Sequence, residues 1–220
     1  MKKIGILFIA LAFLSIACKK NSPENQIIFQ DDFSTNKGWT VGNIQSLIYA
    51  YNNSKYQITV DTPGIMCWSF APYGFTPYSG EINYTYSLKV DFTITLDDNS
   101  KLGLAGLLFN YIDNQNFSFV FISDNGFYEI LQKLNGTPYT IVPATSSKAI
   151  NLEKGSVNTL ELIQNAKTLE LNINNQSIGT FQIGKVNSDI RVGLMVSSDV
   201  IQNFSKVVAS FDNFVLTKIQ

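Results

Sequence analysis

Alternation of apolar and polar residues is the dominant pattern along this chain. From residue 89 to residue 96 every apolar side chain has the same parity: Val90, Phe92, Ile94 and Leu96. The segment 168–173 alternates in the same way, and a period of two with β-branched and aromatic residues is typical of a half-buried strand. Residues 124–126 and 135–136 interrupt such runs with Asn, Asp and Gly, which tolerate the backbone angles of tight turns.

The same pattern continues to the end of the chain and predicts strands at 26–30, 46–51, 55–60, 64–70, 83–96, 102–111, 116–123, 126–133, 138–142, 157–163, 167–173, 177–183, 189–197 and 206–218. No segment after residue 26 shows an apolar stripe with a helical period of 3.6. Strands at this spacing without helices predict an all-β protein, an antiparallel two-sheet β-sandwich or jelly roll. Without an internal repeat or a central linker, residues 27–220 are predicted to form one domain.

The first 18 residues predict export from the cytoplasm. Two lysines precede the apolar stretch 4–13, which is too short to span a bilayer as a helix, and Ala17 precedes Cys18. This arrangement resembles the lipobox of bacterial lipoproteins, in which cleavage leaves a lipid-modified (palmitate-carrying) cysteine at the new N-terminus. The resemblance implies a signal peptide over 1–17 and a lipidated cysteine with its tether over 18–26. The alternative is a cleaved signal of a soluble secreted protein.

The residues around Cys18 bear on the location. Leu14 lies four residues before the cysteine, where the common lipobox has it three before. Lys19 and Lys20 follow the cysteine, whereas an aspartate there would resemble the inner-membrane retention signal of enterobacterial lipoproteins. We therefore expect a lipid anchor in the bacterial cell envelope, in the outer membrane. No acidic run follows the cysteine to indicate display on the cell exterior.

Composition excludes several classes of function. Cleavage after residue 17 leaves 14 basic against 17 acidic residues, which argues against a nucleic-acid partner. The chain has no histidine, and this excludes Ser-His-Asp and Cys-His catalysis as well as histidine metal sites. Once Cys18 is lipidated, Cys67 has no partner for an internal disulfide, and its apolar surroundings favour a buried, inert thiol over a nucleophile.

Several segments occur in an order that resembles a known fold family: FQDDF at 29–33, LAGLLF at 104–109, FSFVF at 117–121, NTLEL at 158–162, LELNINN at 169–175, IRVGL at 190–194 and FDNF at 211–214. The order resembles concanavalin A-like lectin/glucanase jelly rolls, especially the laminin-G-like and keto-disaccharide-hydrolase-type domains of bacterial envelope proteins. The resemblance spans about residues 29–217 and implies the fold. Because that superfamily mixes lectins, carbohydrate-binding modules, glycosidases and proteins of no known activity, it leaves catalysis open.

A glycosidase on this fold would need two carboxylates that flank the scissile bond. The family-16-type glucanases carry Glu-x-Asp-x-x-Glu on one strand, and this chain has no such string. Glu129, among the aromatic residues of 126–130, is the one acid that we single out, and an outward-facing strand charge is its alternative interpretation. The missing pair counts against hydrolysis.

A loop rich in aromatic residues is predicted at 71–80 by its prolines and glycines. Tyr73, Phe75 and Tyr78 on this loop are candidates for stacking against the apolar face of a sugar ring. The alternative is that the loop folds these rings over one end of the sandwich and seals the core. Trp39 and Trp68 are expected to lie in the core.

Asp31 and Asp212 form the candidate metal site. Asp31 shares parity with Phe29 and Phe33, and Asp212 with Phe214, so strict alternation turns both carboxylates toward the apolar side. First and last strands of jelly rolls commonly lie side by side, which would bring the two acids together around a structural calcium ion. In the alternative, bulges at 31–32 and 212–213 let nearby backbone amides satisfy both side chains.

The sequence thus favours a non-catalytic, envelope-anchored β-sandwich that binds a poly- or oligosaccharide. Two alternatives remain: a glycoside hydrolase of the same fold with acids drawn from separate strands, and a structural module that binds other envelope proteins. The one cofactor that the sequence suggests is a structural calcium ion, and we expect the protein to contact the membrane through its N-terminal lipid.

Overall fold

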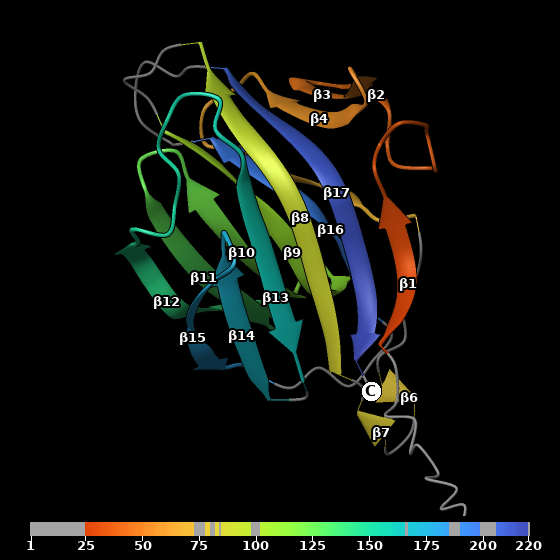
Figure 1. Ribbon diagram of the computed structural model, residues 1–220, viewed down its shortest axis with the longest axis vertical. Helices are drawn as coiled ribbons and strands as arrows, with labels where there is room; N and C mark the ends of the chain where they lie inside the picture. Colours follow the sequence, from red (N-terminus) through yellow and green to blue (C-terminus); the bar gives the residue numbers. More distant parts are fainter. Residues whose placement is uncertain are drawn as a thin grey trace, which may run out of the picture.

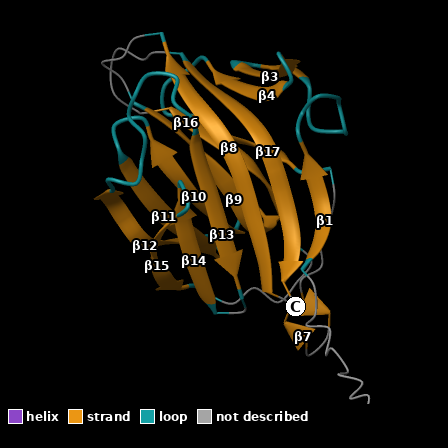
Figure 2. Cartoon of the chain, in the orientation of Figure 1, coloured by secondary structure: helices purple, strands orange, loops and turns teal. Residues whose placement is uncertain are grey.

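The computed structural model describes residues 25–72, 78–79, 82–83, 85–97, 102–165, 167–184, 190–198 and 206–219, with the backbone alone at 78–79 and 82–83. Cys18 and the whole signal region therefore lie outside the described residues. All regular elements in the described ranges are strands (Figure 2). Across these ranges the structure has no helix that is long and apolar enough to cross a membrane.

A nine-stranded antiparallel sheet forms one layer of the protein, in front in Figure 1. Its strands follow the order β15 (Gln176–Gln182), β14 (Thr168–Ile173), β13 (Asn158–Gln164), β8 (Thr85–Leu96), β17 (Val207–Ile219), β4 (Lys55–Val60), β3 (Leu47–Asn52) and β2 (Gly42–Ile44). β1 (Gln26–Asp31) pairs with the C-terminal half of β17. The first and last described strands therefore lie side by side, as expected.

A six-stranded antiparallel sheet forms the second layer, behind the first in Figure 1. Its order is β12 (Thr137–Ser146), β11 (Phe127–Leu134), β10 (Asn116–Ser123), β9 (Gly103–Asp113), β16 (Arg191–Ser198) and β5 (Met66–Phe70). Two short strands, β6 (Tyr78–Ser79) and β7 (Ile82–Asn83), pair separately. The predicted all-β, two-sheet sandwich is confirmed, and β2, β6 and β7 were missed because each has only two or three residues.

The hydrophobic core lies between the two sheets. Val90 and Phe92 of β8 are buried there, as the alternation predicts. Cys67 of β5 is also buried, and burial raises the pKa of its thiol to about 11. The thiol is therefore protonated at neutral pH, which agrees with the expected inert cysteine.

A bulge in β9 changes which residues face outward. Asn110 has φ of 53° and is fully buried, with its side chain between the sheets. Its Oδ1 accepts a hydrogen bond from the Tyr86 hydroxyl at 2.9 Å, and its Nδ2 donates to Gln164 Oε1 at 3.0 Å. Since Phe109 and Asn110 both turn inward, the alternation shifts by one and Tyr111 faces outward.

Candidate functional site

The outer face of the six-stranded sheet carries a continuous aromatic surface. Along each strand, its side chains alternate with residues that face the core between the sheets. They form a second hydrophobic cluster, separate from that core. We call this surface the aromatic face and define it by Trp68, Phe70, Tyr111, Phe117, Phe119 and Phe121. It is drawn from three elements, β5, β9 and β10, which the sheet places close together.

The rings of the aromatic face contact one another without a break. Along β10, the ring centroids of Phe117 and Phe119 lie 6.0 Å apart and those of Phe119 and Phe121 lie 5.4 Å apart, both stacked. Tyr111 continues the series, 6.2 Å from Phe117 and 4.6 Å from Phe70. The three phenylalanines of β10 are buried, with 6–9% of each residue exposed, whereas Phe70 and Tyr111 are half-exposed. The accessible ring area therefore lies on β5 and β9.

Two strand glycines interrupt the large side chains of this surface. Gly193 pairs with Phe70 on one side and Leu108 on the other, and Gly106 lies between Met195 and Phe121. A Cβ atom at Gly193 would overlap the Ser69 carbonyl oxygen, and one at Gly106 would overlap that of Val120. Glycine is required at both positions because neighbouring backbones approach too closely for any side chain.

One end of the aromatic face adjoins an apolar pocket of about 280 Å³ that contains Glu129. Leu104, Phe121 and Phe127 are among its walls, and among the described residues Glu129 is its sole acid. Burial raises the pKa of the Glu129 carboxyl above its usual value. The expectation that Glu129 faces outward on its strand is confirmed, and its side chain is half-buried on the aromatic side of the sheet.

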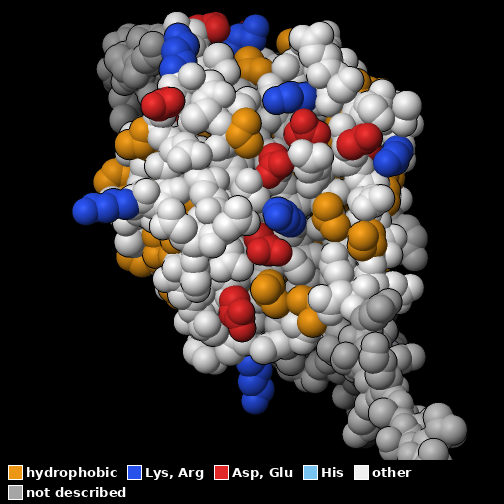
Figure 3. Space-filling model, viewed as in Figure 1, with side chains coloured by type: hydrophobic (Ala, Val, Ile, Leu, Met, Phe, Trp, Pro, Cys, Tyr) orange, Lys and Arg blue, Asp and Glu red, His pale blue; other side chains and the backbone are white. Residues whose placement is uncertain are grey.

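The opposite face of the molecule has a different character. Figure 3 shows the outer surface of the nine-stranded sheet, where acidic and basic side chains are interspersed over β8, β13 and β17. Lys89 lies opposite Glu161 in the register of β8 and β13, and Thr159 donates a hydrogen bond to Asp91 at 2.6 Å. Water solvates these charged side chains on the outer face of the nine-stranded sheet. The two outer faces of the sandwich therefore differ sharply in polarity.

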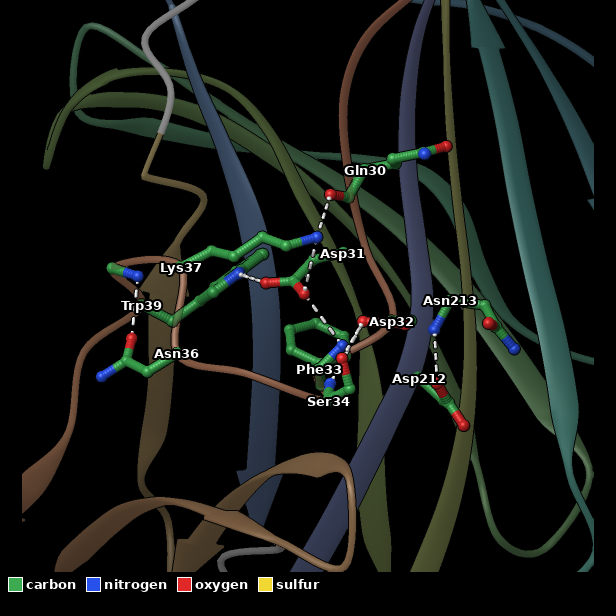
Figure 4. Close-up of polar contacts among 11 residues, drawn as sticks. Gln30, Asp31, Asp32, Phe33, Ser34, Asn36, Lys37, Trp39, Asp212 and Asn213 are labelled. Atoms are coloured by element: carbon green, nitrogen blue, oxygen red, sulfur yellow. Dashed lines mark hydrogen bonds and ion pairs between the residues drawn. The ribbon is translucent and has the colours of Figure 1, made fainter.

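Asp31 is buried at the end of β1 and its carboxylate is fully engaged by this chain (Figure 4). The Trp39 indole N–H donates to Oδ2 at 2.9 Å, and the Phe33 backbone N–H donates to Oδ1 at 2.8 Å. Lys37 Nζ lies 3.4 Å from Oδ1. The expectation that Asp31 turns toward the apolar side is confirmed. Two N–H donors and one lysine of this chain stabilise its negative charge.

Asp212 lies on the other side of the same sheet, contrary to the parity expectation. Asn213 adopts φ of 51° and forms a bulge, so that Phe211 and Phe214 both turn inward and Asp212 turns outward. Asp212 Oδ1 accepts a hydrogen bond from the Asn213 backbone at 2.8 Å. Figure 4 shows its side chain pointing away from Asp31, so the two carboxylates offer a calcium ion no shared site.

Trp39 and Trp68 differ in position. Trp39 is buried in the core as expected, whereas Trp68 is half-exposed on the aromatic face, because Cys67 takes the inward position beside it. The expectation that Trp68 lies in the core is wrong. Tyr73 and Phe75 lie outside the described residues, and Tyr78 begins β6, where only the backbone is described. Their role in sugar stacking stays a prediction.

Comparison with known proteins identifies the fold. No protein-family model and no curated protein matches the sequence. Among solved structures, the carbohydrate-binding module CBM66 from Bacillus subtilis matches with a TM-score of 0.58 and 16% identity, over 81% of this chain and 94% of that one. Arcelin-5, a lectin-like defence protein from Phaseolus vulgaris, matches with a TM-score of 0.63 and 10% identity, over 89% and 98% of the two chains.

A glycoside hydrolase shares the same architecture. The family-16 enzyme of a Bacteroides ovatus mixed-linkage glucan locus, solved with an oligosaccharide product, matches with a TM-score of 0.58 and 11% identity, over 86% of this chain and all of that one. At these identities the likeness shows the fold alone. The lectin-like jelly roll is confirmed, and the closer resemblance to laminin-G-like and keto-disaccharide-hydrolase-type domains stays a prediction.

Proposed function

We propose that this protein is a non-catalytic carbohydrate-binding module that holds an oligosaccharide on the aromatic face and is tethered to the bacterial envelope through Cys18. The observation that carries the binding proposal is the unbroken row of rings on an outer sheet face. Aromatic side chains that are partly exposed together on one sheet face, here Trp68, Phe70 and Tyr111, commonly mark an interaction site. Structural neighbours that include a carbohydrate-binding module and a lectin-like protein support a sugar as the ligand.

The residues of the aromatic face suit a sugar chemically. Half-exposed rings such as Trp68 and Tyr111 offer flat apolar area for the C–H face of a pyranose. Gly106 and Gly193 have no side chains that project between the large ones, so a sugar ring can lie flat on the sheet there. The Tyr111 hydroxyl, which donates to Asn114 Oδ1 at 2.9 Å, adds a polar group at the edge.

Among the described residues no second acid lies beside Glu129, and this supports binding without hydrolysis. Retaining glycosidases need two carboxyl groups about 5–5.5 Å apart and inverting ones about 6.5–9.5 Å apart. In the part of the chain that the structure describes, Glu129 has no acidic neighbour in its pocket. The raised pKa of Glu129 suits a proton donor, so a glycosidase is the second candidate function. The parent protein would then release reducing sugar from a glycan, and Glu129→Gln would not.

Truncation of Trp68 is the direct test of the binding surface. We expect Trp68→Ala to weaken oligosaccharide binding at least about tenfold, because truncation of an aromatic anchor at a binding surface costs about 2 kcal/mol or more. The measurement is titration calorimetry of the full-length protein in detergent, with ligands found on a glycan array. The same array binding with and without calcium tests the metal prediction.

The matched control is Tyr139→Ala. Tyr139 is 48% exposed on β12 and pairs with Gln132, which faces away from the aromatic face. This variant should bind like the parent protein. If Trp68→Ala binds normally while Tyr73→Ala or Tyr78→Ala does not, the site lies on the 71–80 loop instead. A protein that binds no glycan and only pulls down another envelope protein would refute the sugar proposal.

Membrane attachment through Cys18 has its own test. We expect the parent chain to sediment with the outer membrane of a Gram-negative host and Cys18→Ala to appear in the soluble fraction, because the lipid supplies the hydrophobic anchor. Mass spectrometry should find an acylated cysteine at the mature N-terminus. A parent chain that is cleaved, unacylated and soluble would establish the secreted alternative.

A further inference from the structure

Arg191 is the only arginine in the whole sequence, and it lies on the aromatic face. Its guanidinium carbon lies 3.6 Å from the centroid of the Phe70 ring, which is a close cation–π contact. A guanidinium stacked in this way keeps its N–H groups in its own plane, directed away from the ring. Arg191 is exposed, and no described carboxylate forms an ion pair with it.

A second cation lies across the sheet from Arg191. Lys133 of β11 has its Nζ 5.7 Å from the centroid of the Phe117 ring, and it donates to the Asn114 carbonyl at 3.0 Å. Tyr111 contacts both Phe70 and Phe117, so rings join the two cations. Since β16 and β11 are three strand spacings apart, the strands that carry the two cations are separated by about 14 Å.

Among the residues that the structure describes, the charges around these two cations leave their end of the face positive. Asp113 offsets part of the Lys133 charge, and hydrogen bonds from Gln115 and Asn116 lower the pKa of its carboxyl more than Lys133 does. Glu129 lies four residues from Lys133 along β11, about 13 Å away. Among the described residues no carboxylate compensates Arg191, so the guanidinium presents a planar donor beside half-exposed rings.

We propose that the glycan bound by the aromatic face is acidic, with a carboxylate or sulfate ester held by Arg191 and attracted by Lys133. This inference rests on the proposed function and adds the charge of the ligand. The fork of guanidinium N–H groups matches two oxygens of such an anion at once. A sugar ring on Tyr111 or Trp68 would place its acidic substituent beside the Phe70–Arg191 stack.

The test compares acidic glycans with their neutral counterparts. Full-length protein in detergent is titrated with polygalacturonate and with its methyl ester, and with a sulfated galactan and its desulfated form. We expect the preferred acidic member to bind at least about tenfold more tightly than its neutral partner. That preference should shrink between about 0.1 M and 1 M salt, as the screening length falls from about 10 Å to about 3 Å.

Replacement of Arg191 then assigns the preference to the residue. Arg191→Gln should abolish the discrimination between acidic and neutral forms and leave neutral binding in place, while Arg191→Lys should keep only part of it. Lys167→Gln, an exposed lysine at the turn between β13 and β14, is the control and should change nothing. Circular dichroism confirms that each variant is folded.

The outcomes separate the two proposals. Equal binding of acidic and neutral forms overturns the inference and leaves carbohydrate binding intact. Binding of the acidic form that survives in Arg191→Gln also overturns it. Equal binding of single-stranded DNA would show a general polyanion surface rather than an acidic-sugar site. The absence of binding to every glycan refutes the proposed function and the inference with it.

Discussion

Asparagine in place of Asp31 should lower the free energy of unfolding by about 3 kcal/mol, because the buried carboxylate accepts from two donors and pairs with a lysine. An asparagine side chain has one acceptor oxygen, so its NH₂ group would face either the Trp39 indole N–H or the Phe33 backbone N–H. Phe33 has φ of 54°, a conformation that this hydrogen bond helps to hold. Urea unfolding followed by tryptophan fluorescence measures the change.

Asp32→Asn is the matched control for this substitution. Asp32 is the exposed neighbour, and its carboxylate accepts hydrogen bonds from the Ser34 backbone and hydroxyl. Its replacement should change stability far less than that of Asp31. Equal losses in both variants would contradict the interpretation of Asp31 as a buried structural anchor. A calcium-dependent midpoint in the parent protein alone would revive the metal hypothesis.

The two aspartates show how far alternation predicts a β-protein. Counting parity from Phe29 placed Asp31 on the inner side of the sheet, and the structure confirms it. Ile27, which has the same parity, is exposed because the register of β1 shifts between Ile27 and Phe29. The same counting failed at Asp212, because a single bulge residue, Asn213, shifts the phase of β17. A left-handed asparagine within a strand has no distinct local signal, since Asn also occurs in ordinary turns. Parity is therefore reliable only between bulges.

The aromatic face was missed for a related reason. The segments 104–109 and 117–121 carry apolar residues at both parities, so they do not alternate as 89–96 does. Such a run indicates a strand with both faces removed from water, either by packing within the protein or by a bound ligand. The core covers one face of β10, and no described secondary structure element packs over the other. The missing alternation was the signal for the site. Tyr111 could not be placed on it because Asn110 shifts the phase.

Alanine in place of Gly193 should lower the free energy of unfolding by about 3 kcal/mol and weaken glycan binding at least about tenfold. Its Cβ would overlap the Ser69 carbonyl oxygen, so β5 would have to move away from β16. Trp68 and Phe70 are carried by β5, and the movement would separate them from Tyr111. Thermal unfolding and calorimetric titration measure the two effects.

Gly155→Ala separates this steric effect from the general cost of replacing a glycine. Gly155 has φ of 77° and open space around its Cα, so alanine there costs only the left-handed conformation, about 1–2 kcal/mol. It lies in the loop before β13, on no strand of the aromatic face, and its replacement should leave binding unchanged. If Gly193→Ala loses stability but keeps full affinity, the β5 rings do not contact the sugar. The binding surface would then be confined to the rings of β9 and β10, which Tyr111→Ala would test next.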